Sequence, residues 1–182
     1  RSPSRGLGDV YKRQMNKFPR SAYVHIPFCH RRCFYCDFAV IPLGNKVETL
    51  QGYGSKTVKD YLHFLYKEIL SIKHKSSLST IYVGGGTPSI LDPQQIKELI
   101  DLFKENYGVD YGAEITMEVD PASFNQDDLY GFINAGINRF SLGVQSFNNQ
   151  ILQNSGRRHL RENAEKSCIW LKKVYSLSLI HI

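Results

Sequence analysis

The stretch AYVHIPFCHRRCFYC, residues 22–36, joins a short apolar segment to three closely spaced cysteines. Residues 22–26 have the composition of a strand. Cys29, Cys33 and Cys36 follow it in the spacing C-x3-C-x2-C. Thiolates this close in the chain can converge on one soft metal centre just beyond the end of the strand.

The number of cysteines distinguishes two kinds of metal site. A structural zinc ion takes four ligands, and His25 and His30 are the candidates to complete such a site. An iron–sulfur cube held by three cysteines instead leaves one iron open to a further ligand. Cys168 lies on a predicted helix among apolar residues, so we interpret it as a small buried hydrophobe. Arg31 and Arg32 either favour ionised cysteines or form a solvated loop face.

The composition is that of a globular protein with one sizeable core. The chain has 182 residues, 42% of them hydrophobic, which suits a single domain. Its four cysteines are too few for a disulfide scaffold of this size. No segment approaches the roughly 20 consecutive apolar residues that a membrane span requires. These features predict a cytoplasmic protein with reduced thiols and no transmembrane segment.

The positive charge is unevenly distributed along the chain. Residues 1–14 hold four basic side chains and one acidic one, which is half of the net charge of +6. The remaining balance is ordinary, so we predict no nucleic-acid partner. We expect residues 1–14 and 175–182 to be non-native flanking segments around an authentic chain over residues 15–174. A natural N-terminal arm is the alternative for the first segment.

Strand-like and helix-like segments alternate through the middle of the chain. The predicted strands cover residues 22–26, 80–86, 113–119 and 139–144. The first predicted helix carries an apolar stripe from Val58 to Ile72. The next two begin at the caps Asp92 and Asn125, and each ends at a glycine. A short helix from about residue 148 and one over residues 160–173 follow. This order predicts an α/β fold with parallel strands, in a doubly wound sheet or in part of a barrel.

Polar and conformationally special residues gather where the predicted strands end. The cysteines follow the first strand, residues 84–87 (GGGT) follow the second, Glu118 and Asp120 end the third, and Gln145 ends the fourth. Because α/β folds build their sites at the carboxyl ends of parallel strands, we expect these residues to share one site.

The cysteine motif, with Tyr35 just before the third cysteine, resembles the signature of the radical S-adenosylmethionine (SAM) superfamily. The segments IYVGGGTPSIL, EVDP and SLGVQSF extend the resemblance from residue 22 to about residue 172, and within the superfamily it is closest to the oxygen-independent coproporphyrinogen III oxidase group. The resemblance implies the N-terminal part of a partial barrel of six βα units, with about four units present. It also implies a 4Fe-4S cluster on Cys29, Cys33 and Cys36, with SAM on the open iron.

The resemblance further implies a set of cofactor-binding residues. Glu118 can accept hydrogen bonds from ribose hydroxyls, Gln145 can donate and accept, and Arg157 can face a carboxylate. Tyr23 has packing within its strand as an alternative role, and Arg157 has that of a solvated surface charge. The residues that fall at SAM-contacting positions of the group are Tyr23, Tyr35, Gly85, Gly86, Thr87, Glu118, Gln145 and Arg157.

Two short motifs favour the heme chaperone branch of this group over its oxidases. Cys36 is followed by Asp37 and Phe38, whereas the oxidases carry a further cysteine two places after the third. The sequence GRRH at residues 156–159 is also typical of the chaperone branch. The resemblance therefore implies heme binding and transfer to an acceptor protein, with a reductant for the cluster. The alternative is radical oxidative decarboxylation of a porphyrinogen.

Overall fold

A parallel four-stranded sheet forms the centre of the protein in the computed structural model, which describes residues 18–44, 53–72 and 76–174. The strands are β1 (Ser21–Ile26), β4 (Leu78–Gly85), β5 (Val109–Val119) and β6 (Arg139–Leu142), in the order β1-β4-β5-β6. The predicted α/β class with parallel strands is confirmed. The predicted flanking segments, residues 1–14 and 175–182, lie outside the described residues.

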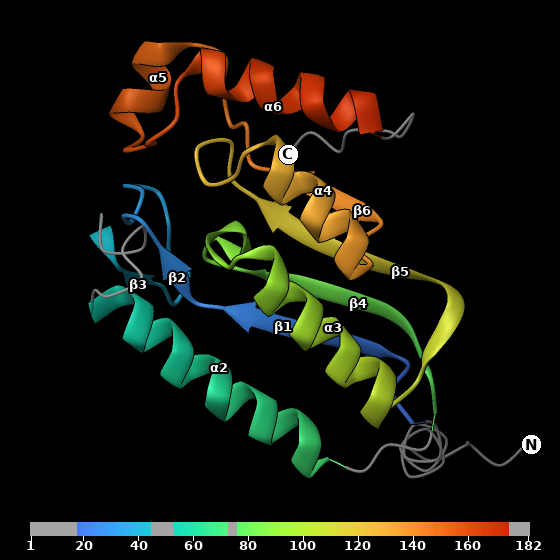
Figure 1. The fold of residues 1–182 in the computed structure, drawn as a ribbon. Coiled ribbons are helices and arrows are strands. Elements are labelled where there is room, and N and C mark those ends of the chain that lie inside the picture. The colour runs from blue at the N-terminus through green and yellow to red at the C-terminus, as the bar shows by residue number, and fades with distance from the viewer. Residues whose placement is uncertain (1–17, 45–52, 73–75, 175–182) are drawn as a thin grey trace, which may run out of the picture.

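Helices follow the strands in the predicted alternation. They are α2 (Tyr53–Ser71), the short 3-10 helix η2 (Pro88–Ile90), α3 (Pro93–Asn106), α4 (Gln126–Ala135), α5 (Asn149–Asn154) and α6 (Arg161–Val174). α2, α3 and α4 lie side by side along one face of the sheet (Figure 1). α6 packs beside the start of α4, where Phe124 and Trp170 meet edge to face with ring centroids 6.1 Å apart.

The caps that the sequence predicted hold the starts of α3 and α4. The Asp92 side chain accepts a hydrogen bond from the backbone N–H of Gln95, and the Gln95 side chain accepts one from the backbone N–H of Asp92. Asn125 and Asp128 form the same reciprocal pair at the start of α4. Each reciprocal pair satisfies two backbone donors that a helix start leaves open. Gly136 ends α4 with a φ of 110°, in the left-handed region that glycine tolerates.

The two faces of the sheet differ in chemistry because successive strand residues point to opposite sides. Apolar residues such as Val24, Ile81 and Met117 pack under the helices and are almost fully buried. The intervening residues of the same strands line the other face, and they include Tyr23, His25, Tyr82, Thr116, Glu118 and Ser141. The helix-covered face therefore supplies the core, and the other face supplies polar groups.

Several boundaries differ from the prediction. β5 begins at Val109, and Ile72 lies beyond the end of α2 and is half exposed. β6 ends at Leu142 because the next residues turn tightly, with the N–H of Val144 donating to the carbonyl of Leu142. Two strands of two residues each, β2 (Phe28–Cys29) and β3 (Ile41–Pro42), are absent from the prediction because two residues carry no detectable period.

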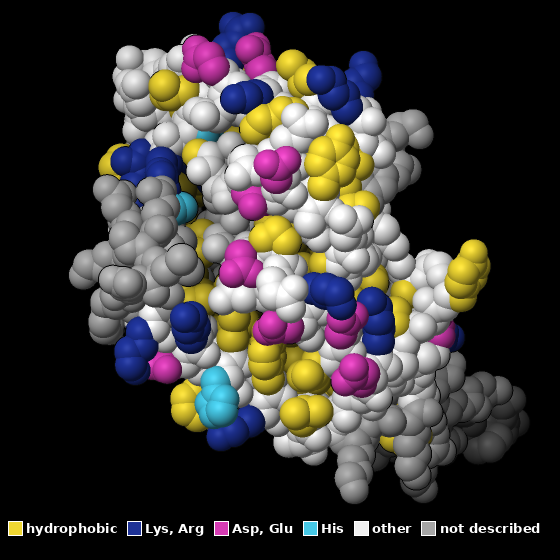
Figure 2. All heavy atoms as spheres, viewed as in Figure 1, with side chains coloured by type: hydrophobic (Ala, Val, Ile, Leu, Met, Phe, Trp, Pro, Cys, Tyr) yellow, Lys and Arg dark blue, Asp and Glu magenta, His cyan; other side chains and the backbone are white. Residues whose placement is uncertain are grey.

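None of the described helices has the length and apolar character needed to cross a bilayer. On the helix-covered face, acidic and basic side chains are interspersed rather than gathered by sign (Figure 2).

Candidate functional site

The cysteines lie on a loop whose base is closed by the short parallel pair of β2 and β3. The N–H of Ile41 donates to the carbonyl of Pro27 at 2.7 Å, and that of Leu43 donates to the carbonyl of Cys29 at 2.8 Å. Within the loop, the N–H of Cys36 donates to the carbonyl of Cys33 at 3.1 Å. These bonds fix both ends of the cysteine segment next to the carboxyl end of β1.

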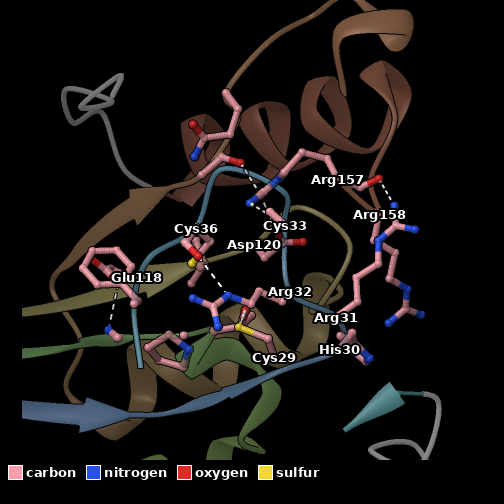
Figure 3. A pocket seen from close by; sticks show the side chains of 18 of the residues that line it. Cys29, His30, Arg31, Arg32, Cys33, Cys36, Glu118, Asp120, Arg157 and Arg158 are labelled. Atoms are coloured by element: carbon pink, nitrogen blue, oxygen red, sulfur yellow. Dashed lines mark hydrogen bonds and ion pairs between the residues drawn. The ribbon is translucent and has the colours of Figure 1, made fainter. Parts of the chain in front are cut away.

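A pocket of about 380 Å³ opens between this loop and the carboxyl ends of the parallel strands (Figure 3). Its volume falls within the usual range for a small-molecule site. All three loop cysteines line it, together with seven of the eight residues predicted to contact SAM: Tyr35, Gly85, Gly86, Thr87, Glu118, Gln145 and Arg157. Residues from five separate parts of the sequence thus meet in one cavity.

The cysteine side chains surround the pocket without forming a preformed single-ion site. Among the described residues, no three side chains of Cys, His, Asp or Glu come together closely enough to hold one metal ion. A four-iron cube needs its thiolates farther apart than one tetrahedral ion does. All four cysteines of the chain are free thiols.

Cys29 is the most buried of the three loop cysteines, with 9% of its surface exposed. Burial raises the pKa of its thiol, and the nearby Cys36, Cys33 and Asp120 raise this pKa further. The hydroxyl of Thr87 donates to the Cys29 sulfur at 3.5 Å and lowers the same pKa. Thr87 thus contacts a predicted cluster ligand in addition to lining the pocket.

Two glycines allow the chain to approach the cysteine loop closely. A Cβ on Gly86 would lie 2.6 Å from the carbonyl oxygen of Phe28 and 2.9 Å from the Cys29 sulfur, so no side chain fits there. Gly85 has a φ of 116°, which residues with a side chain rarely adopt. The glycine-rich end of β4 therefore lets the backbone pack directly against Phe28 and the Cys29 sulfur, which a larger residue would push away.

Glu118 is held at the rim of the pocket by two donors. The hydroxyl of Tyr82 donates to one carboxylate oxygen at 2.7 Å, and the N–H of Gly85 donates to the other at 3.1 Å. Burial, together with the neighbouring Glu118, raises the pKa of Tyr82 to about 12, so this hydroxyl remains a donor at neutral pH. A carboxylate has about four acceptor positions, which leaves Glu118 capacity for a ligand's hydroxyl groups.

Gln145 has an unusual backbone conformation. Its φ is 61°, the one positive φ of a non-glycine residue in the part of the chain that the structure describes. It is the central residue of a turn in which the N–H of Ser146 donates to the carbonyl of Val144 at 2.7 Å. A turn of this kind is strained for a residue with a side chain, and such strain concentrates at functional sites.

Arg157 enters the pocket from the connection between α5 and α6, and 11% of its side chain is exposed. It forms an ion pair with Asp120 and donates to the carbonyl of Gly143 at 2.8 Å. Its second terminal nitrogen lies 3.3 Å from the Tyr35 hydroxyl and 3.8 Å from the Cys33 sulfur. The alternative of a solvated surface charge is therefore wrong for this residue.

Tyr23 lies outside the set of residues that line the pocket. Its ring stacks on Tyr82 with centroids 6.0 Å apart, and its hydroxyl lies 3.1 Å from Nδ1 of His25. Nε2 of His25 lies 3.2 Å from the carbonyl oxygen of Ala39. Both ring nitrogens of His25 therefore have protein partners, as expected for a hydrogen-bonded histidine rather than a zinc ligand.

The two arginines between the cysteines contact backbone oxygens. Arg32 donates to the carbonyl of Cys36 at 2.9 Å, and Arg31 donates to the carbonyl of Arg157. Arg157, far away in the sequence, is the cation that contacts a loop cysteine side chain. Its partner Asp120 was noted in the sequence as a strand-end residue, but nothing in the spacing indicated that these two residues pair.

Comparison with known proteins connects this geometry to a family. The sequence profile described as "Radical SAM superfamily" matches residues 23–182. The chain belongs to the radical SAM superfamily. The superfamily implies a 4Fe-4S cluster and SAM, and the predicted fold, about four βα units of its barrel, is confirmed by the solved structure described below.

The curated relatives of this radical SAM chain carry two names. It is 40% identical to the heme chaperone HemW of Synechocystis over 89% of this chain and 40% of that protein. It is 39% identical to the oxygen-independent coproporphyrinogen III oxidase of Salmonella typhimurium over 73% of this chain and 28% of that protein. The chain thus spans less than half the length of these relatives.

A solved radical SAM enzyme has the same fold. The coproporphyrinogen III oxidase HemN of Escherichia coli matches with a TM-score of 0.74 and 33% sequence identity, over 87% of this chain and 35% of that one.

The pocket residues fit the cofactors that the superfamily implies. Three thiols, the ligand type of iron–sulfur clusters, face one cavity, and the missing side chain at Gly86 lets the backbone that lines this cavity come close to Cys29. Nε of Arg157 is buried and meets no hydrogen-bond partner among the described residues. A buried donor without a partner is costly, which suits a site that an anionic group completes.

Proposed function

We propose that this chain forms the cofactor-binding part of a heme chaperone-like radical SAM protein. It binds a 4Fe-4S cluster through Cys29, Cys33 and Cys36 and binds SAM in the adjoining pocket. The protein binds heme and transfers it to an acceptor protein. The observation that carries the proposal is the meeting of the three cysteines with the glycines of β4, Glu118, Gln145 and Arg157 in one cavity.

Each pocket residue has a distinct task in this proposal. Gly85 and Gly86 admit the polar end of SAM close to the backbone, and Glu118 accepts hydrogen bonds from the ribose hydroxyls. Gln145 orients the cofactor through its amide, and Arg157 faces the carboxylate. When bound, the reduced cluster supplies an electron to the sulfonium of SAM. The protein contributes orientation and the exclusion of water.

Two features of the site favour a chaperone over an oxidase. Phe38 lines the pocket at the position where the oxidases of the group carry a further cysteine. The GRRH motif is built into the site, since Arg157 reaches the pocket and His159 is fully buried behind it. Arg157 and His159 of this motif are thus in positions to affect the cofactor site.

An oxidase is the second candidate. It is supported by the 39% identity to the Salmonella typhimurium enzyme and by the fold shared with HemN. In that case the same pocket serves radical oxidative decarboxylation of a porphyrinogen.

The proposed partners of the protein are heme or a porphyrinogen, an acceptor protein and a one-electron reductant. The free thiols support a cytoplasmic location.

An anaerobic assay distinguishes the two candidates. The reconstituted protein is incubated with coproporphyrinogen III, SAM and a reductant, and it is titrated separately with heme by visible absorbance. We expect a heme absorbance change that saturates and no catalytic formation of protoporphyrinogen. Phe38→Cys introduces the further cysteine of the oxidases, and we expect this variant to keep the cluster. Repeated turnover to protoporphyrinogen by the unmodified protein would overturn the chaperone proposal.

A further inference from the structure

We propose that Asp120 and His159 are positioning residues that hold the guanidinium of Arg157 against Cys33, and that this contact raises the reduction potential of the cluster. The inference rests on the proposed function, because it requires a cluster on Cys33. It assigns a role to two residues that are absent from the predicted cofactor contacts.

Asp120 fixes Arg157 by charge in a buried place. The carboxylate pairs with one terminal nitrogen, Nη2, of the guanidinium, and its other oxygen accepts from the N–H of Ala122 at 3.0 Å. Both carboxylate oxygens of Asp120 therefore have donors, and the inner end of the guanidinium is anchored by an ion pair.

His159 supports the same nitrogen from behind. Its ring is fully buried, and Nε2 lies 3.0 Å from the carbonyl oxygen of Val144. A carbonyl can only accept, so Nε2 carries the hydrogen. In the neutral ring, Nδ1 is then an acceptor, and it lies 3.3 Å from Nη2 of Arg157 and 3.8 Å from the Asp120 carboxylate. The histidine thus gives Nη2 a third and more distant acceptor on its inner side, after Asp120 and the carbonyl of Gly143 at 2.8 Å.

The inner contacts leave the other terminal nitrogen, Nη1, facing the cysteine loop. Nη1 lies 3.8 Å from the Cys33 sulfur, within hydrogen-bond range for sulfur, and 3.3 Å from the Tyr35 hydroxyl. Figure 3 shows Arg157 reaching toward Cys33 and Asp120 across the pocket. Because Nη2 has acceptors deeper in the protein, the guanidinium cannot turn away without breaking the ion pair.

Further hydrogen bonds tie the cysteine loop to the connection between α5 and α6. The N–H of Phe34 donates to the carbonyl of Ser155 at 3.0 Å, and Arg31 donates to the carbonyl of Arg157. The cysteine loop and the connection between α5 and α6 are therefore joined on both sides of the contact between Arg157 and Cys33. The distance between guanidinium and sulfur is set by these bonds and by Asp120 together.

A cationic donor at one cysteine sulfur has a definite effect on a cluster. When a low-potential donor gives one electron to the cluster, the cluster becomes more negative and the donor becomes oxidised. A positive N–H donor stabilises the more negative state, and hydrogen bonds to cluster sulfurs are among the factors that set reduction potentials. Loosening Arg157 therefore makes the cluster harder to reduce.

The test compares the midpoint potentials of reconstituted variants, measured by redox titration with electron paramagnetic resonance detection. Asp120→Asn also removes a negative charge near the cysteines, which alone would make the cluster easier to reduce, so a lower potential in this variant reports the loosened Arg157. We expect the ratio of reduced to oxidised cluster at a fixed potential to fall about tenfold, a shift of about 59 mV for one electron. His159→Leu removes the third acceptor but keeps the ion pair and the bond to the carbonyl of Gly143, so we expect a smaller shift in the same direction. If Asp120→Asn does not fold, the potential of His159→Leu alone tests the inference.

Glu114→Gln is the matched control. Glu114 lies on β5, the strand that ends directly before Asp120, and pairs with Arg139 at 3.3 Å on the surface, outside the pocket lining. We expect its cluster to keep the original potential. The inference is overturned if Asp120→Asn and His159→Leu assemble normal clusters with unchanged potentials. If the unmodified chain assembles no cluster, the proposed function fails, and the inference fails with it.

Discussion

At the scale of single residues, Thr87 combines two contacts that the sequence could not connect. It lines the pocket, and its hydroxyl donates to the sulfur of Cys29 at 3.5 Å. Burial raises the pKa of this thiol, and the donated hydrogen bond lowers it again because it stabilises the ionised sulfur. The hydroxyl therefore favours the thiolate that binds a metal centre.

Thr87→Val should slow the alkylation of Cys29 in the cluster-free protein. Without the donated bond the pKa of Cys29 rises, so at pH 8 a smaller fraction of the thiol is ionised. A hydrogen bond worth about 1 kcal/mol corresponds to a rate roughly fivefold lower. The measurement is the rate of iodoacetamide labelling of Cys29, followed by peptide mass spectrometry. Thr87→Ser keeps the hydroxyl and should label at the original rate; equal rates in all three proteins would contradict the role of the hydroxyl.

Gln145 shows a trade between stability and function. Its φ of 61° is strained for a residue with a side chain and unstrained for glycine. We expect Gln145→Gly to raise the free energy of unfolding by about 1 kcal/mol, measured by urea denaturation, and to weaken SAM binding in equilibrium dialysis. Gln145→Ala loses the same amide but keeps the strain, so it should weaken binding without the gain in stability. Undiminished SAM binding by both variants would exclude a cofactor role for this amide.

At the scale of elements, the cysteine loop depends on the connection between α5 and α6. Gly156 in that connection has a φ of 75°, and a Cβ there would lie 3.2 Å from both the ring and the backbone nitrogen of Phe34. The cysteine loop therefore packs on the one residue type that leaves it room. This contact joins segments more than a hundred residues apart, which no local pattern reveals.

Gly156→Ala should disturb cluster assembly beyond its effect on backbone strain. Gly112 has a nearly equal φ of 77°, and a Cβ there meets no atom of the described residues within 4 Å. Both alanine variants carry a strain of about 1 kcal/mol, but Gly156→Ala also displaces Phe34 and the loop. We expect a lower iron content after reconstitution for Gly156→Ala than for Gly112→Ala. Equal iron content would show that the contact with Phe34 does not matter.

The elements with a strong local signal were the ones the sequence predicted. The residues that cap the starts of α3 and α4, Asp92 and Asn125, and the glycine that ends α4, Gly136, are predicted directly from residue types at fixed positions. The two-residue strands β2 and β3 are not, because their pairing depends on the path of the loop between them. Short tertiary pairings of this kind leave no trace in hydrophobic periodicity.

At the scale of the whole molecule, the parallel topology explains why so much of the site was predictable. Parallel strands bring their carboxyl ends to one edge, so strand-end residues such as Glu118 and Gln145 were expected to meet. The ion pair of Asp120 with Arg157 and the position of His159 were not predicted, because they depend on how the connection after α5 folds back over the pocket. The placement of Tyr23 outside the pocket also required the structure.

The most direct measurement of the central claim is anaerobic reconstitution with iron and sulfide, followed by iron analysis and Mössbauer spectroscopy with and without SAM. We predict about four irons per chain in the unmodified protein and in Cys168→Ala, little iron in Cys33→Ala, and a changed signal from one iron when SAM is added. A chain that carries zinc or no metal at these cysteines, or a spectrum that SAM leaves unchanged, would contradict the account.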